Sequence, residues 1–260
     1  MATAGTTPTH RTVLITGAGR RIGRAMAEAL GADGWAVGVH YHGSPAEADD
    51  VVRTVTASGG RAKALRADLA DPAAVAGLIP ACAAALGPVG ALINNASLFE
   101  RDDIQSATLK SWETHINVNL RAPFFLSQAF AAGLASGDHG AIINIIDERV
   151  WHLTPHFATY TVSKAGLWTL TQTLALALAP NIRVNAVGPG PTLPSPRQTP
   201  DQFAAQCQSM PLGRGTTPAE ICAAVKFILA APAMTGQMIA LDGGQHLGWG
   251  QVAKGGNPED

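Results

Sequence analysis

Seven short apolar runs, separated by Ala- and Leu-rich stretches of helical character, restrict the fold of this chain more than any other feature. Short apolar runs of this kind are typical of strands that are buried on both faces. When such strands alternate with helices, the strands are parallel and right-handed helical crossovers cover both faces of the sheet. The pattern therefore predicts an α/β fold built on one doubly wound, seven-stranded parallel sheet. The runs are residues 12–16, 36–41, 61–67, 89–94, 140–146, 182–187 and 237–241.

The chain has 260 residues, 47% of them hydrophobic, which is enough to bury a large core, and no linker divides it. We expect one domain over residues 12–249. Residues 1–11 lack the apolar segment of a secretory signal and are predicted to be a disordered leader, and residues 250–260 a flexible tail. The long Pro-rich stretch 188–217 is predicted to be an irregular substrate lid, because long irregular segments in compact domains commonly cover a ligand.

Composition argues against several classes of partner. The formal net charge is −1 and there is no run of five or more Lys or Arg residues, whereas nucleic acids and anionic membranes are bound by a concentrated positive field. The longest apolar stretch, 165–180, is interrupted by threonines and is too short to span a membrane. Three cysteines without metal-ligand spacing, Cys82, Cys207 and Cys222, indicate a reduced, cytoplasmic chain. We expect a small-molecule substrate, no nucleic acid and no membrane.

Asp147, Tyr160 and Lys164 follow the predicted strand 140–146 in a D-x12-Y-x3-K arrangement. A Tyr and a Lys four residues apart share one face of a helix, so the ammonium can favour the ionised phenol and make Tyr160 a usable acid near neutral pH. A carboxyl group in an apolar cleft has its proton affinity raised, so Asp147 could be a second proton donor. Two structural alternatives remain: Asp147 could cap a loop or pair with Arg149, and Y-x3-K alone also occurs in ordinary amphipathic helices.

The first predicted strand runs straight into a glycine-rich turn, T-G-A-G-R-R-I-G, over residues 16–23. Glycines in a strand-to-helix turn let the backbone approach a diphosphate, and the helix N-terminus supplies N–H donors. The turn therefore predicts a dinucleotide site, although a purely structural glycine turn is the alternative. His40 and His42 share one face of the second strand, but a metal site needs further ligands and none is nearby, so no metal is predicted.

The segments A-T-Y-T-V-S-K (158–164) and T-G-A-G-R-R-I-G resemble the signatures of the short-chain dehydrogenase/reductase family, whose fold is Rossmann-like. Two positions depart from the family pattern: Asp147 stands where Ser is usual, and Arg21 where the middle Gly is usual. The second strand also ends without the acidic residue that binds the adenosine ribose and repels a 2′-phosphate. These features predict NADPH as the cofactor, with Arg21, His42 and Ser44 near its 2′-phosphate.

The resemblance covers residues 12–247 and implies further roles. In the family, Asp68 would contact the adenine, the residues at the end of the fourth strand would lie beside the cofactor ribose, and the segment after the sixth strand would orient the nicotinamide amide. Asn119 matches the active-site Asn that holds a water in a proton relay from Lys164. Family members are commonly homotetramers, and Trp249 could pack across such an interface. The cofactor-binding residues implied in this way are Gly17, Arg20, Arg21, Ile22, Gly23, His42, Ser44, Asp68, Asn95, Ala96, Pro189, Gly190 and Thr192.

Within the family, five local features resemble pteridine reductases and bacterial dihydromonapterin (alternative dihydrofolate) reductases. They are the ending R-R-I-G of the glycine turn, H-Y-H-x-S after the second strand, N-A-S-x-F at 95–99, the Asp at 147, and D-G-G-Q-H-L at 242–247. Phe99 would stack a pterin against the nicotinamide and Ser97 would make a polar contact with it. Phe99 could also be an ordinary core aromatic. Gly43, where parasite pteridine reductases have Arg, and the sequence after Thr192 depart from the group.

The reaction implied by these residues is NADPH-dependent reduction of a pterin-type C=N bond, as in a dihydropterin or dihydrofolate-like substrate. Tyr160 would protonate the adjacent ring nitrogen, Lys164 with Asn119 would resupply the proton, and Asp147 would assist as a second acid. One alternative is a general carbonyl or imine reductase in which Asp147 only orients water. Another is a catalytically silent NADPH-binding regulator.

Overall fold

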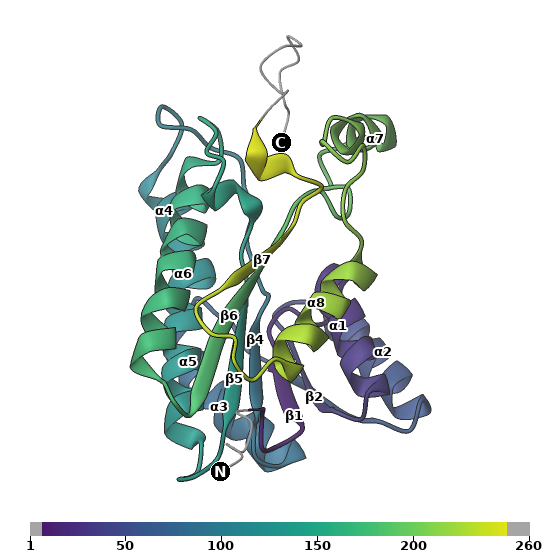
Figure 1. The fold of residues 1–260 in the computed structure, drawn as a ribbon, viewed down its shortest axis with the longest axis vertical. Coiled ribbons are helices and arrows are strands. Elements are labelled where there is room, and N and C mark those ends of the chain that lie inside the picture. The colour runs from purple at the N-terminus through teal and green to yellow at the C-terminus, as the bar shows by residue number, and fades with distance from the viewer. Residues whose placement is uncertain (1–6, 249–260) are drawn as a thin grey trace.

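The computed structural model describes residues 7–248, and within them the sheet has the predicted architecture (Figure 1). Seven strands, all parallel, lie in the order β3-β2-β1-β4-β5-β6-β7. The α/β, Rossmann-like prediction is confirmed. The strands are β1 Thr12–Ile15, β2 Ala36–Tyr41, β3 Arg61–Arg66, β4 Ala91–Asn94, β5 Gly140–Ile145, β6 Ile182–Pro189 and β7 Met238–Leu241.

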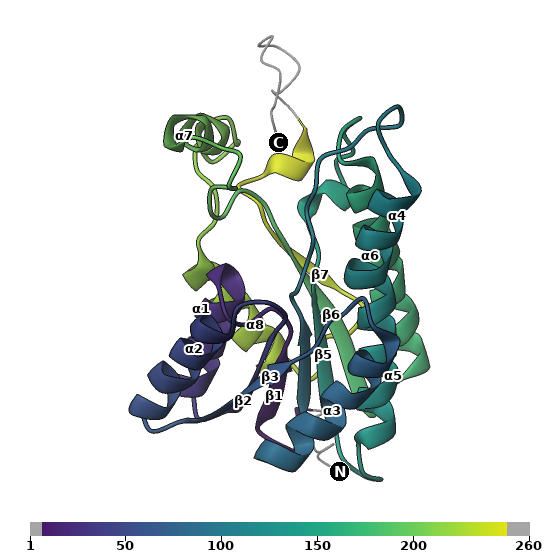
Figure 2. The same ribbon diagram turned by 180° about the vertical axis from the view of Figure 1, so that it is seen from behind.

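Helices cover both faces of the sheet (Figures 1 and 2). On one side lie α1 (Arg21–Ala32), α2 (Pro45–Ala57) and α8 (Pro218–Ala230), and on the other α3 (Pro72–Leu86), α4 (Leu109–Ile116), α5 (Ala122–Gly133) and α6 (Ala158–Ala177). A π-helical turn over Asn117–Arg121 joins α4 to α5, and α7 (Pro200–Gln208) lies beyond the carboxyl ends of the strands.

The two faces of the central strands supply two separate cores. Val13 and Ile15 point into the core beneath α1, α2 and α8, whereas Leu14 between them points into the core beneath α3 and α5, and all three are fully buried. Successive side chains of a strand point to opposite faces, so a strand covered on both sides is apolar throughout. Because β1 lies between β2 and β4, the strand order reverses at its carboxyl end, which is where open α/β sheets bind ligands.

The N-terminal segment is more ordered than the sequence indicates. The Thr9 N–H donates to the carbonyl of His139 over 2.9 Å, and the ring of His10 bonds the Asp138 carboxyl over 2.8 Å. The prediction of a disordered leader over 1–11 is therefore wrong at residues 9 and 10, because bonds to the loop before β5 hold them. Residues 1–6, the predicted tail and Trp249 lie outside the described residues.

The predicted lid segment, 188–217, is not irregular throughout. Helix α7 lies within it and begins with a capping box, in which Thr199 Oγ1 accepts from the Gln202 N–H over 3.2 Å and Gln202 Oε1 accepts from the Thr199 N–H over 2.8 Å. Pro200 follows at the first helical position, where its missing N–H costs nothing. The many prolines of this segment thus conceal a helix that is only nine residues long.

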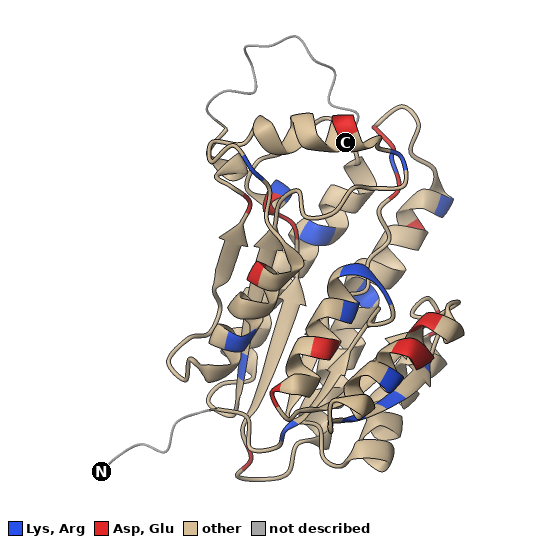
Figure 3. Ribbon diagram, turned by 90° about the vertical axis from the view of Figure 1, so that its right-hand side faces the viewer, with Lys and Arg blue, Asp and Glu red and all other residues tan. Residues whose placement is uncertain are grey.

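In the view of Figure 3, Lys and Arg residues are interspersed with Asp and Glu along the helices. Over residues 7–248, no helix is both long and apolar enough to cross a membrane.

Candidate active site

One cavity of about 1050 Å³ opens at the carboxyl ends of the strands, and residues of the segment 188–217 form part of its lining. Its volume matches the upper end of the range for ligand sites, roughly 300–1000 Å³. Every site residue predicted from the sequence lines it except Asn119. These residues are Gly17, Arg20, Arg21, Ile22, Gly23, His42, Ser44, Asp68, Asn95, Ala96, Ser97, Phe99, Asp147, Tyr160, Lys164, Pro189, Gly190 and Thr192.

The glycine turn is held tightly against the end of β4. Gly17 has φ +64°, and a Cβ there would lie 3.0 Å from Ala96 Cα. A Cβ on Gly23 would lie 2.1 Å from the carbonyl oxygen of Gly17, so only glycine lets α1 begin this close to the turn. The Asn95 amide fastens the turn by donating to the carbonyl of Thr16 over 2.8 Å.

His40 supports the glycine turn, a role that the sequence reasoning missed. Its Nδ1 accepts from the Gly17 N–H over 3.0 Å, so its Nε2 carries the proton and donates to the carbonyl of Ala67 over 3.2 Å. Burial lowers the pKa of His40 to about 4, which keeps the ring neutral and its Nδ1 available as an acceptor. The ring therefore supports the glycine turn and is not half of a metal pair with His42. Among residues 7–248 no group of three or more potential ligands could hold a metal.

These features fit a dinucleotide cofactor. No side chain caps the N-terminus of α1 and its first turn has no acidic residue, so its N–H groups are available to an anion in the cavity wall. Gly17 and Gly23 leave the backbone bare where a diphosphate would lie. The cavity continues without a break from this turn to Asp147 and Tyr160, so it has room for both a dinucleotide and a substrate.

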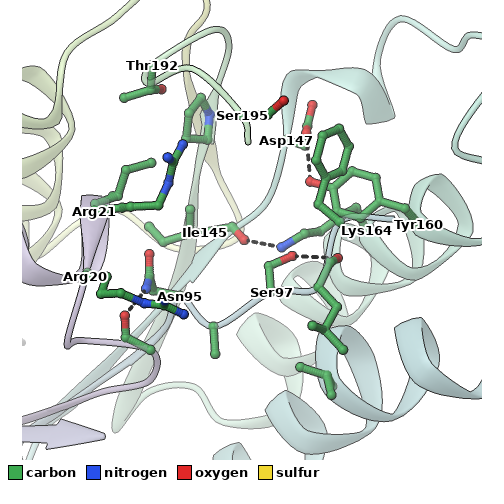
Figure 4. Close-up of a pocket in the computed structure, with 18 of the residues that line it drawn as sticks. Arg20, Arg21, Asn95, Ser97, Ile145, Asp147, Tyr160, Lys164, Thr192 and Ser195 are labelled. Carbon is green, nitrogen blue, oxygen red and sulfur yellow. Dashed lines mark hydrogen bonds between the residues drawn. The ribbon is translucent and has the colours of Figure 1, made fainter. Parts of the chain in front are cut away.

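Arg21 lies elsewhere than the sequence indicates. Its guanidinium donates to the carbonyls of Pro194 and Leu193 over 2.9 and 3.1 Å, and Figure 4 shows the side chain directed toward the lid segment near Thr192. The residue has φ +52°, an unusual conformation for a non-glycine residue. The donors of Arg21 thus bond the lid segment in this structure, and its predicted contact with a 2′-phosphate beside His42 stays a prediction.

Asp147, Tyr160 and Lys164 meet at the end of β5 (Figure 4). The Tyr160 hydroxyl donates to Asp147 Oδ2 over 2.8 Å, and Lys164 Nζ donates to the carbonyl of Ile145 over 2.9 Å. Lys164 Nζ also lies 5.8 Å from the centre of the Tyr160 ring. The helical spacing of the two residues thus brings them together beside a carboxyl group from another element.

The electrostatics of this group differ from the sequence-based expectation. Burial, the Asp147 charge and the hydrogen bond to Asp147 raise the pKa of Tyr160 well above its ordinary value. Burial lowers the pKa of Lys164 to about 8, and the Asp147 charge opposes that shift. The expected lowering of the Tyr160 pKa by Lys164 is therefore wrong for this state, because Asp147 is hydrogen-bonded to the phenol and Lys164 is not.

Asp147 also caps a loop, which was the structural alternative to its catalytic role. Its Oδ1 accepts from the Arg149 N–H over 2.9 Å and caps a short turn at Glu148–Val150, while its Oδ2 accepts from Tyr160. One carboxyl group thus bonds both the loop and the phenol.

The sequence reasoning missed Glu148, which also lines the cavity and is 3% exposed. Burial and the Asp147 charge raise the pKa of Glu148 to about 8.

Asn119 is fully buried and does not line the cavity. Its side-chain amide forms a two-way bond with the backbone of Leu98, at 2.9 Å in each direction, and donates to Ser163 Oγ over 3.0 Å. The amide therefore holds the chain after β4 in place. The relay role implied by the family resemblance stays a prediction. The π-helical turn that contains Asn119 is a feature frequently found at functional sites.

Phe99 is half-buried at the substrate end of the cavity. Its ring is stacked on Phe157, with centroids 4.4 Å apart, and meets the edge of Tyr160 at 4.7 Å. From the lid segment, Arg197 lies 5.0 Å from the Phe99 centroid and donates to the Phe99 carbonyl over 3.2 Å. Ser97 is exposed in the same wall and donates to the carbonyl of Leu98 over 3.2 Å. An aromatic surface thus adjoins the phenol.

Comparison with known proteins identifies the family. A family model described as Enoyl-(Acyl carrier protein) reductase matches residues 17–246, which include the glycine turn and the Tyr160–Lys164 pair. The chain belongs to the short-chain dehydrogenase/reductase family. This oxidoreductase shares 34% identity over 241 residues with 3-oxoacyl-[acyl-carrier-protein] reductase from Synechocystis, covering 91% of this chain and 97% of that protein.

Two solved structures are more similar in sequence. FolM alternative dihydrofolate reductase 1 from Brucella suis, in complex with NADP, is 44% identical to this chain and has a TM-score of 0.89. The match covers 92% of this chain and 96% of the Brucella suis chain. Its counterpart from Brucella canis, also complexed with NADP, has 42% identity and a TM-score of 0.87, with 92% and 95% covered.

Proposed function

We propose that this protein is an NADPH-dependent reductase of a pterin-type C=N bond in a dihydropterin or dihydrofolate-like substrate. The observation that carries the proposal is the hydrogen bond of 2.8 Å between the Tyr160 hydroxyl and Asp147 Oδ2, in a cavity that also contains the Phe99 ring. A phenol and a carboxyl group side by side provide two sites for protons. Similarity to the two NADP-bound FolM structures supports the same substrate class and cofactor.

The glycine turn, Asn95 with Ala96 and the segment Pro189–Thr192 would hold NADPH, which supplies the hydride when bound. The Tyr160 hydroxyl would give its proton to the ring nitrogen next to the reduced carbon. Lys164, whose pKa burial lowers to about 8, is close enough to its proton-releasing range to resupply that proton with the help of Asn119. His42 and Ser44 would contact the 2′-phosphate.

Asp147 would act as the second acid of the site. For this role Asp147 would first take up a proton, which the Tyr160 hydroxyl that donates to its Oδ2 can pass to it, and Lys164 would resupply Tyr160. Asp147 would then give that proton to a second ring nitrogen. Phe99 would present one π-face to a flat heteroaromatic ring, and Ser97 a hydroxyl to its polar edge.

A general carbonyl reductase is the second candidate. The relative from Synechocystis is named for a 3-oxoacyl substrate, and the Tyr160–Lys164 pair by itself suffices to protonate a ketone oxygen. In that case Asp147 would orient water and hold the turn at Glu148–Val150. A catalytically silent NADPH-binding regulator remains a third hypothesis, and any NADPH turnover that depends on Tyr160 would refute it.

The experiment that tests the proposal is a substrate comparison. Purified protein is assayed for NADPH oxidation with dihydrobiopterin, dihydromonapterin, dihydrofolate and an acetoacetate ester, with Tyr160→Phe as the inactive control. We expect a pterin or folate to give the highest kcat/KM. If the protein reduces the ester but none of the three heteroaromatic substrates, the proposal is refuted and the carbonyl reductase is established.

We also propose that the protein is a cytoplasmic homotetramer. Large apolar side chains lie partly exposed on the side of the molecule covered by α4, α5 and α6, including Trp112, Phe124, Phe125 and Val162. Burial of such side chains between identical subunits is favourable and would generate a closed, symmetric assembly. Sedimentation equilibrium tests the stoichiometry, and a monomer at micromolar concentration would refute it.

A further inference from the structure

The helix that carries Tyr160 and Lys164 begins without a capping side chain of its own. Helix α6 starts after Phe157, which has φ +58° and makes no side-chain cap hydrogen bond. The first N–H groups of a helix have no partner within the helix, and a buried end without partners is unfavourable. Because Phe157 and Thr159 are buried, partners for this end must come from elsewhere in the fold.

Asp102, which precedes Thr159 by 57 residues, supplies those partners. Its backbone carbonyl accepts from the Phe157 N–H over 2.6 Å, and its Oδ1 accepts from the Thr159 N–H over 3.2 Å. Its Oδ2 accepts from the Thr159 hydroxyl over 2.5 Å. Asp102, which is 6% exposed, therefore caps α6 from a distant loop. The helix dipole also favours a negatively charged carboxyl group at this end of the helix.

The same bonds continue through a buried histidine to the substrate wall. His115 Nε2 accepts from the Glu100 N–H over 3.1 Å, so Nδ1 carries the proton and donates to Thr159 Oγ1 over 2.7 Å. His115 is 0% exposed, and burial lowers its pKa, which keeps the ring neutral. The donors thus run in one direction, from Glu100 through His115 and Thr159 to Asp102.

This chain of bonds closes on the loop that carries Phe99. Glu100 follows Phe99 directly, and Asp102 lies two residues further, so both ends of the chain lie in one short loop. Phe157, whose N–H Asp102 binds, is the ring on which Phe99 stacks at 4.4 Å, and Tyr160 lies three residues beyond it. The bonded chain of Glu100, His115, Thr159 and Asp102 therefore fixes the Phe99 ring relative to the Tyr160 hydroxyl.

We infer that Asp102, with Thr159 and His115, is a positioning group that sets the gap between the aromatic wall and the proton donor, and so determines how a flat substrate is held. The inference rests on the proposed function in one respect, the aromatic substrate. None of the three side chains lines the cavity, so the group acts through Phe99 and Tyr160 and not by contact with substrate.

Asp102→Asn and Thr159→Val test the inference, with Thr159→Ser as the conservative replacement. Asparagine replaces one acceptor with a donor that faces either the Thr159 N–H or its hydroxyl. Valine has the shape of threonine but leaves Asp102 and His115 without their shared partner. Asp103→Asn is the matched control, because the Asp103 carboxyl group accepts its hydrogen bonds from Gln105 and Ser106, within its own turn.

We expect Asp102→Asn and Thr159→Val to raise the KM for dihydrobiopterin by about tenfold or more and to lower kcat, while the NADPH Kd from fluorescence titration stays within about twofold of wild type. Thr159→Ser and Asp103→Asn should remain close to wild type. If the group had only a structural role, the two variants would have a lower Tm and weaker NADPH binding as well as a higher KM. Wild-type kinetics in Thr159→Val, or an equal loss in Asp103→Asn, would overturn the inference.

Nitrogen-15 NMR of the histidine rings gives a readout independent of turnover. The inference requires neutral His115 with the proton on Nδ1 in wild type and Thr159→Ser, and loss of that single tautomer in Thr159→Val. If wild type reduces the acetoacetate ester but no pterin, the proposed function fails. The positioning role is then judged by the kcat for the ester, which should still fall in Thr159→Val. An Nε2–H tautomer in wild type would refute the positioning role whatever the substrate.

Discussion

Replacement of Asp147 by serine tests whether the carboxyl group distinguishes pterin from carbonyl chemistry. In the structure Asp147 makes two side-chain bonds, one to the Arg149 N–H and one to the Tyr160 hydroxyl. Serine restores the residue usual in the family and can still accept from a neighbouring N–H, but it cannot be an acid near neutral pH. The variant therefore removes the second acid while it preserves a short polar side chain at the turn.

The expected magnitude follows from the lost bond. A hydrogen bond that involves a charged group contributes about 1.5–3 kcal/mol, which corresponds to a factor of roughly 10–150 in rate if the bond acts only in the transition state. We expect kcat/KM for folate or biopterin, whose full reduction takes up two hydrides and two protons, to fall by about that factor. For the acetoacetate ester it should be unchanged or should increase, because the ketone needs only Tyr160.

The pH dependence gives a second, signed expectation. The Asp147 charge and hydrogen bond both raise the pKa of Tyr160, so their removal lowers that pKa toward its ordinary value. The alkaline limb of kcat/KM for the ester should then begin at a lower pH in Asp147→Ser than in wild type. Asp147→Asn is the control, because it removes the charge but retains an acceptor.

The assay is the initial rate of NADPH oxidation for both substrates across neutral and alkaline pH, with NADPH affinity measured separately. Parallel losses on the pterin and on the ester would refute the reasoning. Asp147 would then serve only the geometry of the turn at Glu148–Val150, and the pterin assignment would rest on Phe99 and the similarity to the FolM structures.

Three further predictions concern other residues of the cavity. Tyr160→Phe should lower turnover by a factor of about 10²–10⁴ in steady-state assays and leave the NADPH Kd unchanged. Arg21→Ala should weaken NADPH and NADH binding to a similar extent in paired titrations, because its guanidinium bonds Leu193 and Pro194; a loss confined to NADPH would instead indicate a 2′-phosphate contact. Glu148→Gln should flatten the dependence of the unfolding free energy on pH between about 4.5 and 8. The raised pKa gives wild type a contribution that is fully present below pH 4.5 and is lost as pH rises through 8, on the order of 5 kcal/mol in urea titrations.

The fold could be predicted from the sequence because its signal is local and repeated. Each of the seven apolar runs coincides with a strand to within a few residues, and the parallel order follows from the helices between them. The exception within the domain is α7, which buries none of its residues and so lacks an apolar face that a pattern could reveal. Its only signal is the pair Thr199 and Gln202 around Pro200, which is a capping box.

The site could be predicted only where one motif contains it. Tyr160 and Lys164 meet because they are four positions apart on a helix, and the glycine turn fixes its own position. Residues whose role depends on a distant segment left no such signal. His40 supports Gly17, and Asp102 caps α6, through contacts that exist only after the sheet and loops have assembled. A buried polar residue next to a predicted site is therefore a reasonable candidate for a supporting role even without a motif.

Unfavourable local features, namely positive φ angles at non-glycine residues and a buried carboxyl group, lie around one cavity. Among residues 7–248, Arg21 and Phe157 are the two non-glycine residues with positive φ, and Arg21 lines the cavity while Phe157 stacks on a ring that does. Glu148 is a buried carboxyl next to Asp147, and burial together with the Asp147 charge disfavours its ionisation. Such conformations persist only where surrounding bonds hold them, and they concentrate at functional sites. Two loops and the start of α6 are therefore held in less stable local arrangements by Asp102, Asp147 and the lid carbonyls.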